Sequence, residues 1–124
     1  MTAHPPSEFD RHYLETWTEP NPDRRRANIE RMWSPDGRLV VSSIGVTFRG
    51  VVEIAEHVAG VHEQNIAERG LRFVYDQHAE ADDALLLRWS MLAPDGSAVG
   101  RGVDVVFRDA DGRVQTVYMF MGIN

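Results

Sequence analysis

Residues 99–121, VGRGVDVVFRDADGRVQTVYMFM, have the pattern of two β-strands joined by a tight turn. Valine, phenylalanine, tyrosine and threonine favour strands, and the segment DADG between them is a turn signal. Successive side chains of a strand point to opposite faces of its sheet. One face of the first strand carries Gly100, Gly102, Asp104, Val106 and Arg108. The pair predicts an antiparallel sheet at this end of the chain.

Asp104 raises the question of which face points inward, because an ionised carboxylate without partners is costly to bury. Hydrophobicity favours the opposite face, which carries Val99, Arg101, Val103, Val105 and Phe107. The alternative is that this apolar face lies on the outside of the sheet and is covered by a second subunit. The two glycines would then leave room above the sheet beside Asp104. Periodicity alone does not choose between these arrangements.

The final strand is apolar on both faces, which fits a sheet with helices on one side and a partner on the other. One face carries Val114, Thr116, Tyr118 and Phe120, and the other carries Gln115, Val117, Met119 and Met121. A homodimer through the outer face of the sheet is therefore expected.

The chain before this pair supplies three helices and four further strands. Aromatic residues at four-residue spacing predict a first helix over 7–18, capped by Ser7. Asn21 followed by Pro22 predicts a second helix that ends at about Trp33. A third helix is expected over 51–68, ended by Gly70. Strands are expected at 38–43, 46–49, 71–80 and 84–92.

Helices followed by strands indicate the α+β class, with the helices on one face of the sheet. A curved sheet wrapped on three N-terminal helices makes a cone-shaped barrel whose open mouth is a favoured ligand site. The mostly antiparallel sheet and the helices are expected to form one domain over residues 7–124. Residues 1–6 are expected to be a short tail.

Composition narrows the function classes for this chain of 124 residues. The net charge of −6 argues against sequence-independent binding of nucleic acid. No apolar run is long enough to span a membrane, and the N-terminus lacks the pattern of a signal peptide, so we expect a cytoplasmic protein. His57 and His62 are five residues apart and no third ligand is evident, so no metal site is expected. His78 and Asp76 fall near a hairpin end and are expected to be exposed.

Three segments carry a resemblance to a known family: HYLETW at 12–17, FRGVVEIAEHV at 48–58 and VDVVFRDADGRVQTVYMF at 103–120. They resemble the nuclear transport factor two-like superfamily, in its SnoaL-like and ketosteroid isomerase-like branch. The resemblance covers nearly the whole chain. It implies the same cone fold and turns Asp104 inward.

The resemblance also implies roles for individual residues. Tyr13 matches the tyrosine that binds the oxyanion in ketosteroid isomerases, and Asp104 matches their protonated aspartic acid, which donates to the same oxygen. The isomerase's general base falls at Val41 in this sequence, and neither Val41 nor the serines after it can act as a base. His57 is the candidate to replace that base. SnoaL-like polyketide cyclases use an acidic residue as acid/base, so an ionised Asp104 is the alternative.

We therefore expect a cofactor-independent enzyme of the isomerase, cyclase or dehydratase type. Its substrate would be a hydrophobic cyclic, polyketide-like or steroid-like molecule, and its catalytic residues Tyr13, Asp104 and His57. The expected ligand-binding residues are Trp17, Trp33, Val41, Val58, Trp89, Val106, Val117, Met119 and Met121. The alternatives are a module that binds an apolar ligand without catalysis and a structural dimer with a collapsed core. Convergence of the three catalytic candidates on one cavity would favour the enzyme.

Overall fold

The computed structural model describes residues 8–122, so the expected tail and the cap at Ser7 lie outside the described residues. The helices are α1 (Glu8–Thr18), α2 (Pro22–Met32) and α3 (Gly50–Val61), and α3 continues as a π-helical segment η1 (His62–Ala67). The strands are β1 (Trp33–Val41), β2 (Val46–Arg49), β3 (Arg72–Ala81), β4 (Ala84–Leu92), β5 (Ala98–Arg108) and β6 (Val114–Met121). The expected order of elements is confirmed.

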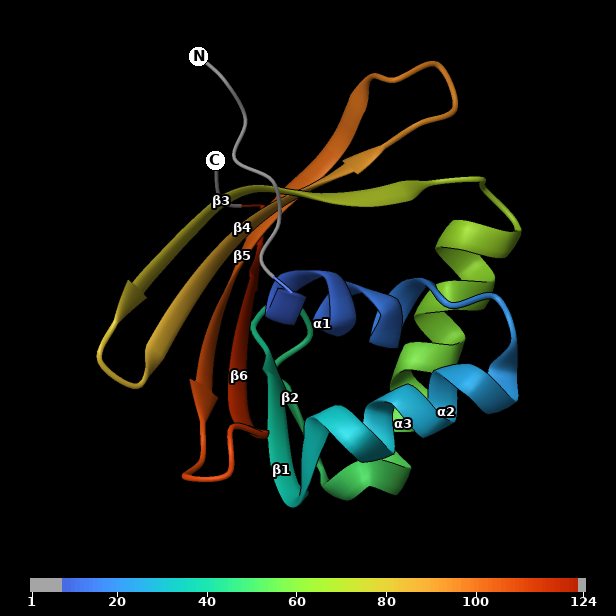
Figure 1. The fold of residues 1–124 in the computed structure, drawn as a ribbon. Coiled ribbons are helices and arrows are strands. Elements are labelled where there is room, and N and C mark those ends of the chain that lie inside the picture. Colours follow the sequence, from blue (N-terminus) through green and yellow to red (C-terminus); the bar gives the residue numbers. More distant parts are fainter. Residues whose placement is uncertain (1–7, 123–124) are drawn as a thin grey trace.

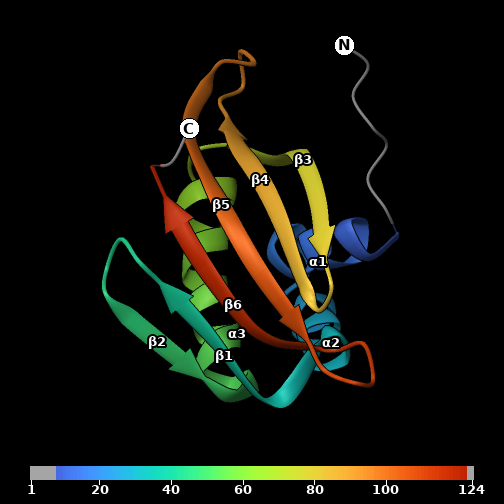
Figure 2. The same cartoon turned by 90° about the vertical axis from the view of Figure 1, so that its left-hand side faces the viewer.

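The strands form one six-stranded sheet in the order β2-β1-β6-β5-β4-β3. Only the β1–β6 pair is parallel among the described strands, and the other pairs are antiparallel. The sheet curves around the helices, which all lie on its concave side (Figure 1). The view at a right angle shows the strands crossing in front of α3 (Figure 2). This is the predicted α+β cone.

The boundary between α2 and β1 differs from the prediction. Asn21 caps α2 by accepting a hydrogen bond of 3.0 Å from the backbone N–H of Arg24, as its sequence position suggests. The helix ends one residue early, because Trp33 is extended and pairs with Val114 of β6. The strand therefore begins at Trp33 and not at residue 38, and the register shift between Trp33 and Arg38 takes up the residues that separate the expected helix from the expected strand.

The third helix ends close to where it was predicted to end, but its hydrogen-bonding pattern changes along its length. Regular α-helical bonding stops at Val61, and residues His62–Ala67 continue with wider π-helical turns. Gly70 then adopts a φ of +66°, which favours glycine and ends the helical segment where predicted.

The face that carries Gly102, Asp104 and Val106 points into the cone, which confirms the orientation implied by the resemblance. All three residues are buried, and the exposed fraction of Asp104 is 3 %. Val114 corrects the predicted pattern of the final strand. A bulge lets Phe107 pair with Thr116 while Arg108 pairs with Val114, so Val114 turns into the core instead of sharing the outer face.

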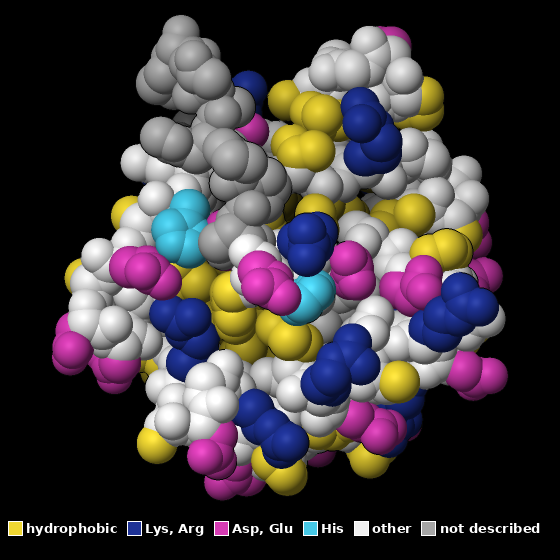
Figure 3. All heavy atoms as spheres, in the orientation of Figure 1, with side chains coloured by type: hydrophobic (Ala, Val, Ile, Leu, Met, Phe, Trp, Pro, Cys, Tyr) yellow, Lys and Arg dark blue, Asp and Glu magenta, His cyan; other side chains and the backbone are white. Residues whose placement is uncertain are grey.

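The surface mixes charges of both signs. Acidic and basic side chains alternate over the helices in the view of Figure 3. Among residues 8–122, no helix is long and apolar enough to cross a membrane.

Candidate functional site

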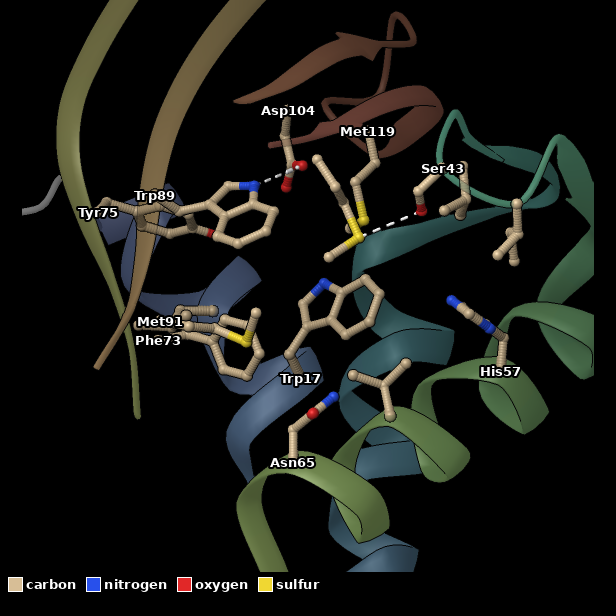
Figure 4. A pocket seen from close by; sticks show the side chains of 15 residues that line it. Trp17, Ser43, His57, Asn65, Phe73, Tyr75, Trp89, Met91, Asp104 and Met119 are labelled. Atoms are coloured by element: carbon tan, nitrogen blue, oxygen red, sulfur yellow. Dashed lines mark hydrogen bonds between the residues drawn. The ribbon is translucent and has the colours of Figure 1, made fainter. Parts of the chain in front are cut away.

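A cavity of about 190 Å³ lies between the concave face of the sheet and the helices α1, α3 and η1. Seven of the predicted site residues line it: Trp17, Val41, His57, Trp89, Asp104, Met119 and Met121. The remaining wall was not assigned to a ligand site from the sequence: Leu14, Ser43, Ile44, Val61, Asn65, Phe73, Tyr75 and Met91. Figure 4 shows that the labelled side chains come from both layers and point toward a common space.

The other five predicted residues do not line this cavity. Trp33, Val58, Val106 and Val117 belong to the solid core beneath it, where each is at most 1 % exposed. Tyr13 is also fully enclosed, and its ring packs against Phe9 and Trp33 at centroid distances of 6.0 and 6.4 Å. The sequence pattern identified the inner face correctly for these residues. The pattern could not distinguish residues that are buried in the solid core from residues that line a cavity.

Among the described residues that line the cavity, only Asp104 carries a carboxyl group. The indole Nε1–H of Trp89 donates a hydrogen bond of 3.0 Å to its Oδ1. Burial raises the pKa of Asp104 to about 7, because the ionised form loses its hydration, while the Trp89 bond opposes this rise by stabilising the carboxylate. Near neutral pH, both the protonated and the ionised form are therefore populated.

Gly102 explains how Trp89 reaches Asp104. The two strands pair so that Trp89 lies directly opposite Gly102, two residues from Asp104 on the same face. A Cβ atom at position 102 would stand 2.3 Å from Cζ2 of Trp89 and 2.6 Å from the carbonyl oxygen of Phe120. The missing side chain lets the indole lie flat on β5. Gly102 was predicted to leave room in the cavity, but the Trp89 ring fills the space above it.

Two tyrosines lie near the carboxyl group. Burial and the charge of Asp104 raise the pKa of Tyr13 well above its usual value, and a contact with the Trp17 side chain offsets only part of this. The same two causes, with smaller contributions from Tyr13 and Asp10, raise the pKa of Tyr75. Both hydroxyls therefore stay protonated at neutral pH. The sequence signal for Tyr75 is its alternation with Phe73 in the strand 71–80, which places both side chains on one face.

His57 lies across the cavity from Asp104. Its ring stacks on Phe48 at a centroid distance of 4.1 Å and meets the edge of Trp17 at 6.1 Å. Burial lowers the pKa of His57, so the imidazole is neutral at pH 7 and can accept a proton. Among the described residues, no direct hydrogen bond joins His57, Tyr13 and Asp104. The structure thus brings two of the three catalytic candidates to one cavity.

Two further polar pairs lie outside the cavity wall, one between Asp10 and His78 and one between Asp76 and Ser90. Asp10 is 1 % exposed, and its Oδ2 lies 2.6 Å from Nδ1 of His78 on β3. The Ser90 hydroxyl likewise donates a hydrogen bond of 2.5 Å to Oδ2 of Asp76. His78 and Asp76 are exposed, as predicted, but each bonds a buried partner. In the part of the chain that the structure describes, no group of three or more acidic or histidine side chains could hold a metal ion.

The sequence profile of the SnoaL-like domain matches residues 11–117, which is most of the chain. The chain belongs to the SnoaL-like family. This family lies in the nuclear transport factor two-like superfamily, as the resemblance implied. A search of curated proteins finds no significant match.

Solved structures support the SnoaL-like assignment. A candidate isomerase of the SnoaL-like family from Agrobacterium tumefaciens is 26% identical, with a TM-score of 0.82 over 93% of this chain and 95% of that chain. A candidate SnoaL-like polyketide cyclase from Jannaschia sp. CCS1 is 17% identical, with a TM-score of 0.70 over 96% and 91% of the two chains. A hypothetical protein with a ketosteroid isomerase-like fold from Catenulispora acidiphila, solved with trimethylamine, is 16% identical, with a TM-score of 0.70 over 94% and 86%. The last two similarities show the fold alone.

Proposed function

We propose that this SnoaL-like protein is a cofactor-independent acid/base enzyme that isomerises, cyclises or dehydrates a hydrophobic keto compound. The observation that carries the proposal is the Asp104 carboxyl group, which lies on the wall of an otherwise largely apolar cavity with its pKa raised to about 7. A proton donor is most effective when its pKa is close to the working pH. A buried carboxyl group with this property is a candidate for chemistry.

The proposed reaction passes through an enol. Protonated Asp104 donates its proton to the carbonyl oxygen of the substrate, and neutral His57 removes a proton from the adjacent carbon. The C–H electron pair forms the new carbon–carbon double bond, and the carbonyl π pair takes up the proton from Asp104. When His57 returns its proton to a different carbon, the enol O–H gives its proton back to Asp104 and an isomer is formed. When the enol carbon instead attacks a second carbonyl and closes a ring, the π pair of that carbonyl takes the proton from His57 and the enol O–H returns its proton to Asp104.

The lining supports a cyclic, polyketide-like or steroid-like substrate. Tryptophan, phenylalanine and methionine side chains form most of the wall, and they suit a flat apolar skeleton. Isomerase and polyketide cyclase are also the activities in the names of two structural relatives. The Trp89 indole would hold the Asp104 carboxyl group in position while its proton moves.

Deuterium exchange tests the proposal without knowledge of the natural substrate. A panel of apolar cyclic ketones and 1,3-diketones is incubated with the protein in D2O, and uptake at the carbon beside the carbonyl is followed by mass spectrometry. We expect exchange at least tenfold above the buffer rate for some members. Asp104→Asn should abolish this increase, and His57→Gln should reduce it. Asp83→Asn, in the exposed turn before β4, is the matched control and should keep the wild-type rate.

The opposite result would favour a binding module. If panel members bind in the cavity but the wild-type protein does not accelerate exchange of any of them, the acid/base reading is wrong. The apolar lining would then serve ligand storage or transport.

We further propose that the protein is a homodimer through the outer face of the sheet. Val99 of β5 is 50 % exposed and Phe120 of β6 is 40 % exposed. Phe120 belongs to the outer face by strand alternation, opposite Val103 of β5. Light scattering during size-exclusion chromatography should give twice the chain mass. Phe120→Glu should give a monomer, whereas Val52→Glu on the exposed side of α3 should not. A monomeric wild-type protein would contradict this assembly.

A further inference from the structure

Asn65 is a polar residue of the cavity wall that the proposed reaction does not use. It lies on η1, the π-helical continuation of α3, and lines the cavity together with His57 and Val61. Figure 4 shows Asp104 and Asn65 at opposite ends of this space, with the Trp17 indole between them. A flat ligand held at Asp104 by one end would therefore place its other end near Asn65.

The π-helical turns bring Asn65 to this wall. In a regular α-helix of about 3.6 residues per turn, the spacing between His57 and Asn65 would leave their side chains about 80° apart around the axis. Hydrogen bonds in the π-helical segment join residues five positions apart, as between the backbone N–H of Glu68 and the carbonyl oxygen of Glu63, so each residue rotates the chain by a smaller angle. The wider turns reduce the rotation between His57 and Asn65, and both residues line the cavity. Such segments occur frequently at functional sites.

A contact with Arg69 fixes which atom of the Asn65 amide is free to meet a ligand. Nη1 of Arg69 donates a hydrogen bond of 3.4 Å to Oδ1 of Asn65. A guanidinium group has donors only, so the amide oxygen faces Arg69 and the amide nitrogen points elsewhere. Figure 4 shows the Asn65 side chain extending from η1 toward the cavity. Within residues 8–122 the amide N–H groups have no hydrogen-bond partner, so they can donate to an acceptor on a ligand.

We infer that the Asn65 amide selects ligands that carry a second acceptor oxygen, at the end remote from the reacting carbonyl. The ligand class is a flat apolar ketone with an ether, hydroxyl or carbonyl oxygen at its far end. A ligand with a purely apolar far end would cover the Asn65 N–H groups without pairing them, which weakens its binding. This inference rests on the proposed function, because the first oxygen is the carbonyl that Asp104 protonates. Asn65 is thus a specificity residue and not a catalytic one.

Two ketones of nearly equal shape test this role. 6-Methoxy-2-tetralone and 6-ethyl-2-tetralone differ in one ether oxygen at the end remote from the carbonyl, and isothermal titration calorimetry at pH 6 gives the dissociation constant of each. We expect Asn65→Leu to lower the preference for the methoxy compound at least threefold, because the donor to its ether oxygen is lost. Asn65→Asp keeps the shape of the side chain and an acceptor for Arg69 but has no N–H group. It should lower the preference by at least the same factor, and it covers the case in which Asn65→Leu does not fold.

Asn28 provides a matched control on another helix. Like Asn65, it accepts a hydrogen bond at Oδ1 from an arginine of its own helix, in this case from Nη2 of Arg31 on α2. Asn28 does not line the cavity. Asn28→Leu should therefore leave the preference for the methoxy compound within twofold of the wild-type value. An equal loss of preference in Asn28→Leu and Asn65→Leu would overturn the inference.

Deuterium exchange of the same two ketones separates this inference from the proposed function. If the wild-type protein accelerates exchange and both Asn65 variants keep the wild-type preference, the role of Asn65 is overturned while the proposed function stands. If both variants lose the preference but the wild-type protein does not accelerate exchange, Asn65 recognises the far oxygen and the acid/base reaction is wrong. If neither ketone binds to the wild-type protein, the ligand class is wrong and the inference fails with it.

Discussion

Two buried aspartates, Asp10 and Asp104, occupy different ends of the same core. Asp10 is 1 % exposed and meets the imidazole of His78 at 2.6 Å, which ties α1 to β3. Asp104 is 3 % exposed and receives a hydrogen bond from a neutral indole at 3.0 Å. The hydrogen-bond partner of Asp10 is an imidazole, and that of Asp104 is a neutral indole.

The difference shows how the partner, more than the depth of burial, decides what a carboxyl group can do. An imidazole can compensate the charge of a carboxylate, so the Asp10–His78 pair can act as a structural link. An indole N–H compensates only part of the desolvation, so the pKa of Asp104 rises to about 7 and its proton becomes exchangeable at neutral pH. The first arrangement favours stability and the second favours chemistry.

The largest expected effect is on the pH dependence of stability. The pKa of Asp104 is raised from 3.8 to about 7 on folding, so the folded protein holds this proton more tightly than the unfolded chain. The free energy of unfolding therefore falls as pH rises from about 4 to 7. At about 1.4 kcal/mol per pKa unit, the loss reaches at most about 4 kcal/mol.

Asp104→Asn removes this loss. We expect the variant to be more stable than the wild type at pH 8, by up to about 4 kcal/mol, and similar at pH 4. Urea unfolding at both pH values, followed by circular dichroism, measures the difference. An equal difference at both pH values would show that Asp104 does not titrate as described.

The next effect concerns the strand that positions Asp104. Gly102→Ala should destabilise the fold by about 1–3 kcal/mol, because the new Cβ atom meets both the Trp89 ring and the backbone carbonyl of Phe120. Gly100→Ala is the matched control on the same strand, since its Cβ meets only the flexible end of Met91 at 2.7 Å. Thermal unfolding of both variants measures the effect. Equal losses would argue against the role of Gly102 in seating the indole.

A smaller loss is expected at the other aspartate. His78→Ala should lower the free energy of unfolding by about 1–2 kcal/mol, because Asp10 loses a hydrogen-bonded partner while still buried. The same variant should leave the rate of deuterium exchange unchanged, since His78 is not on the cavity wall. A large loss of exchange rate with normal stability would contradict the division of roles between the two aspartates.

The smallest expected change is a shift of one pKa. Trp89→Phe removes the indole N–H that stabilises the Asp104 carboxylate, so the pKa of Asp104 should rise above about 7. The carboxyl ¹³C resonance of Asp104, followed over a pH titration by nuclear magnetic resonance, measures this shift. A fall in the pKa would mean that solvent reaches the carboxyl group once the indole is gone.

The sequence allowed the fold to be predicted where local patterns govern it. Strand alternation put Gly102, Asp104 and Val106 on one face, and the resemblance turned that face inward. Alternation failed at Val114, where a bulge shifts the register, and the boundary of β1 was missed at Trp33, because no local signal marks either irregularity.

The candidate site was only partly predictable, because contacts between distant segments define it. Asp10 and His78 are 68 positions apart in the chain, and their contact depends on how α1 packs against β3. Tyr75 could be assigned to a face but not to a cavity, since that depends on the curvature of the sheet.

The Trp89–Asp104 hydrogen bond has an optical consequence. The emission of an indole depends on the charge and polarity around it, and Trp89 contacts the very group that titrates near pH 7. Two of the three tryptophans, Trp17 and Trp89, line the cavity. The protein thus contains an intrinsic fluorescent reporter, in which the protonation of Asp104 and the arrival of a ligand can both be followed without a label.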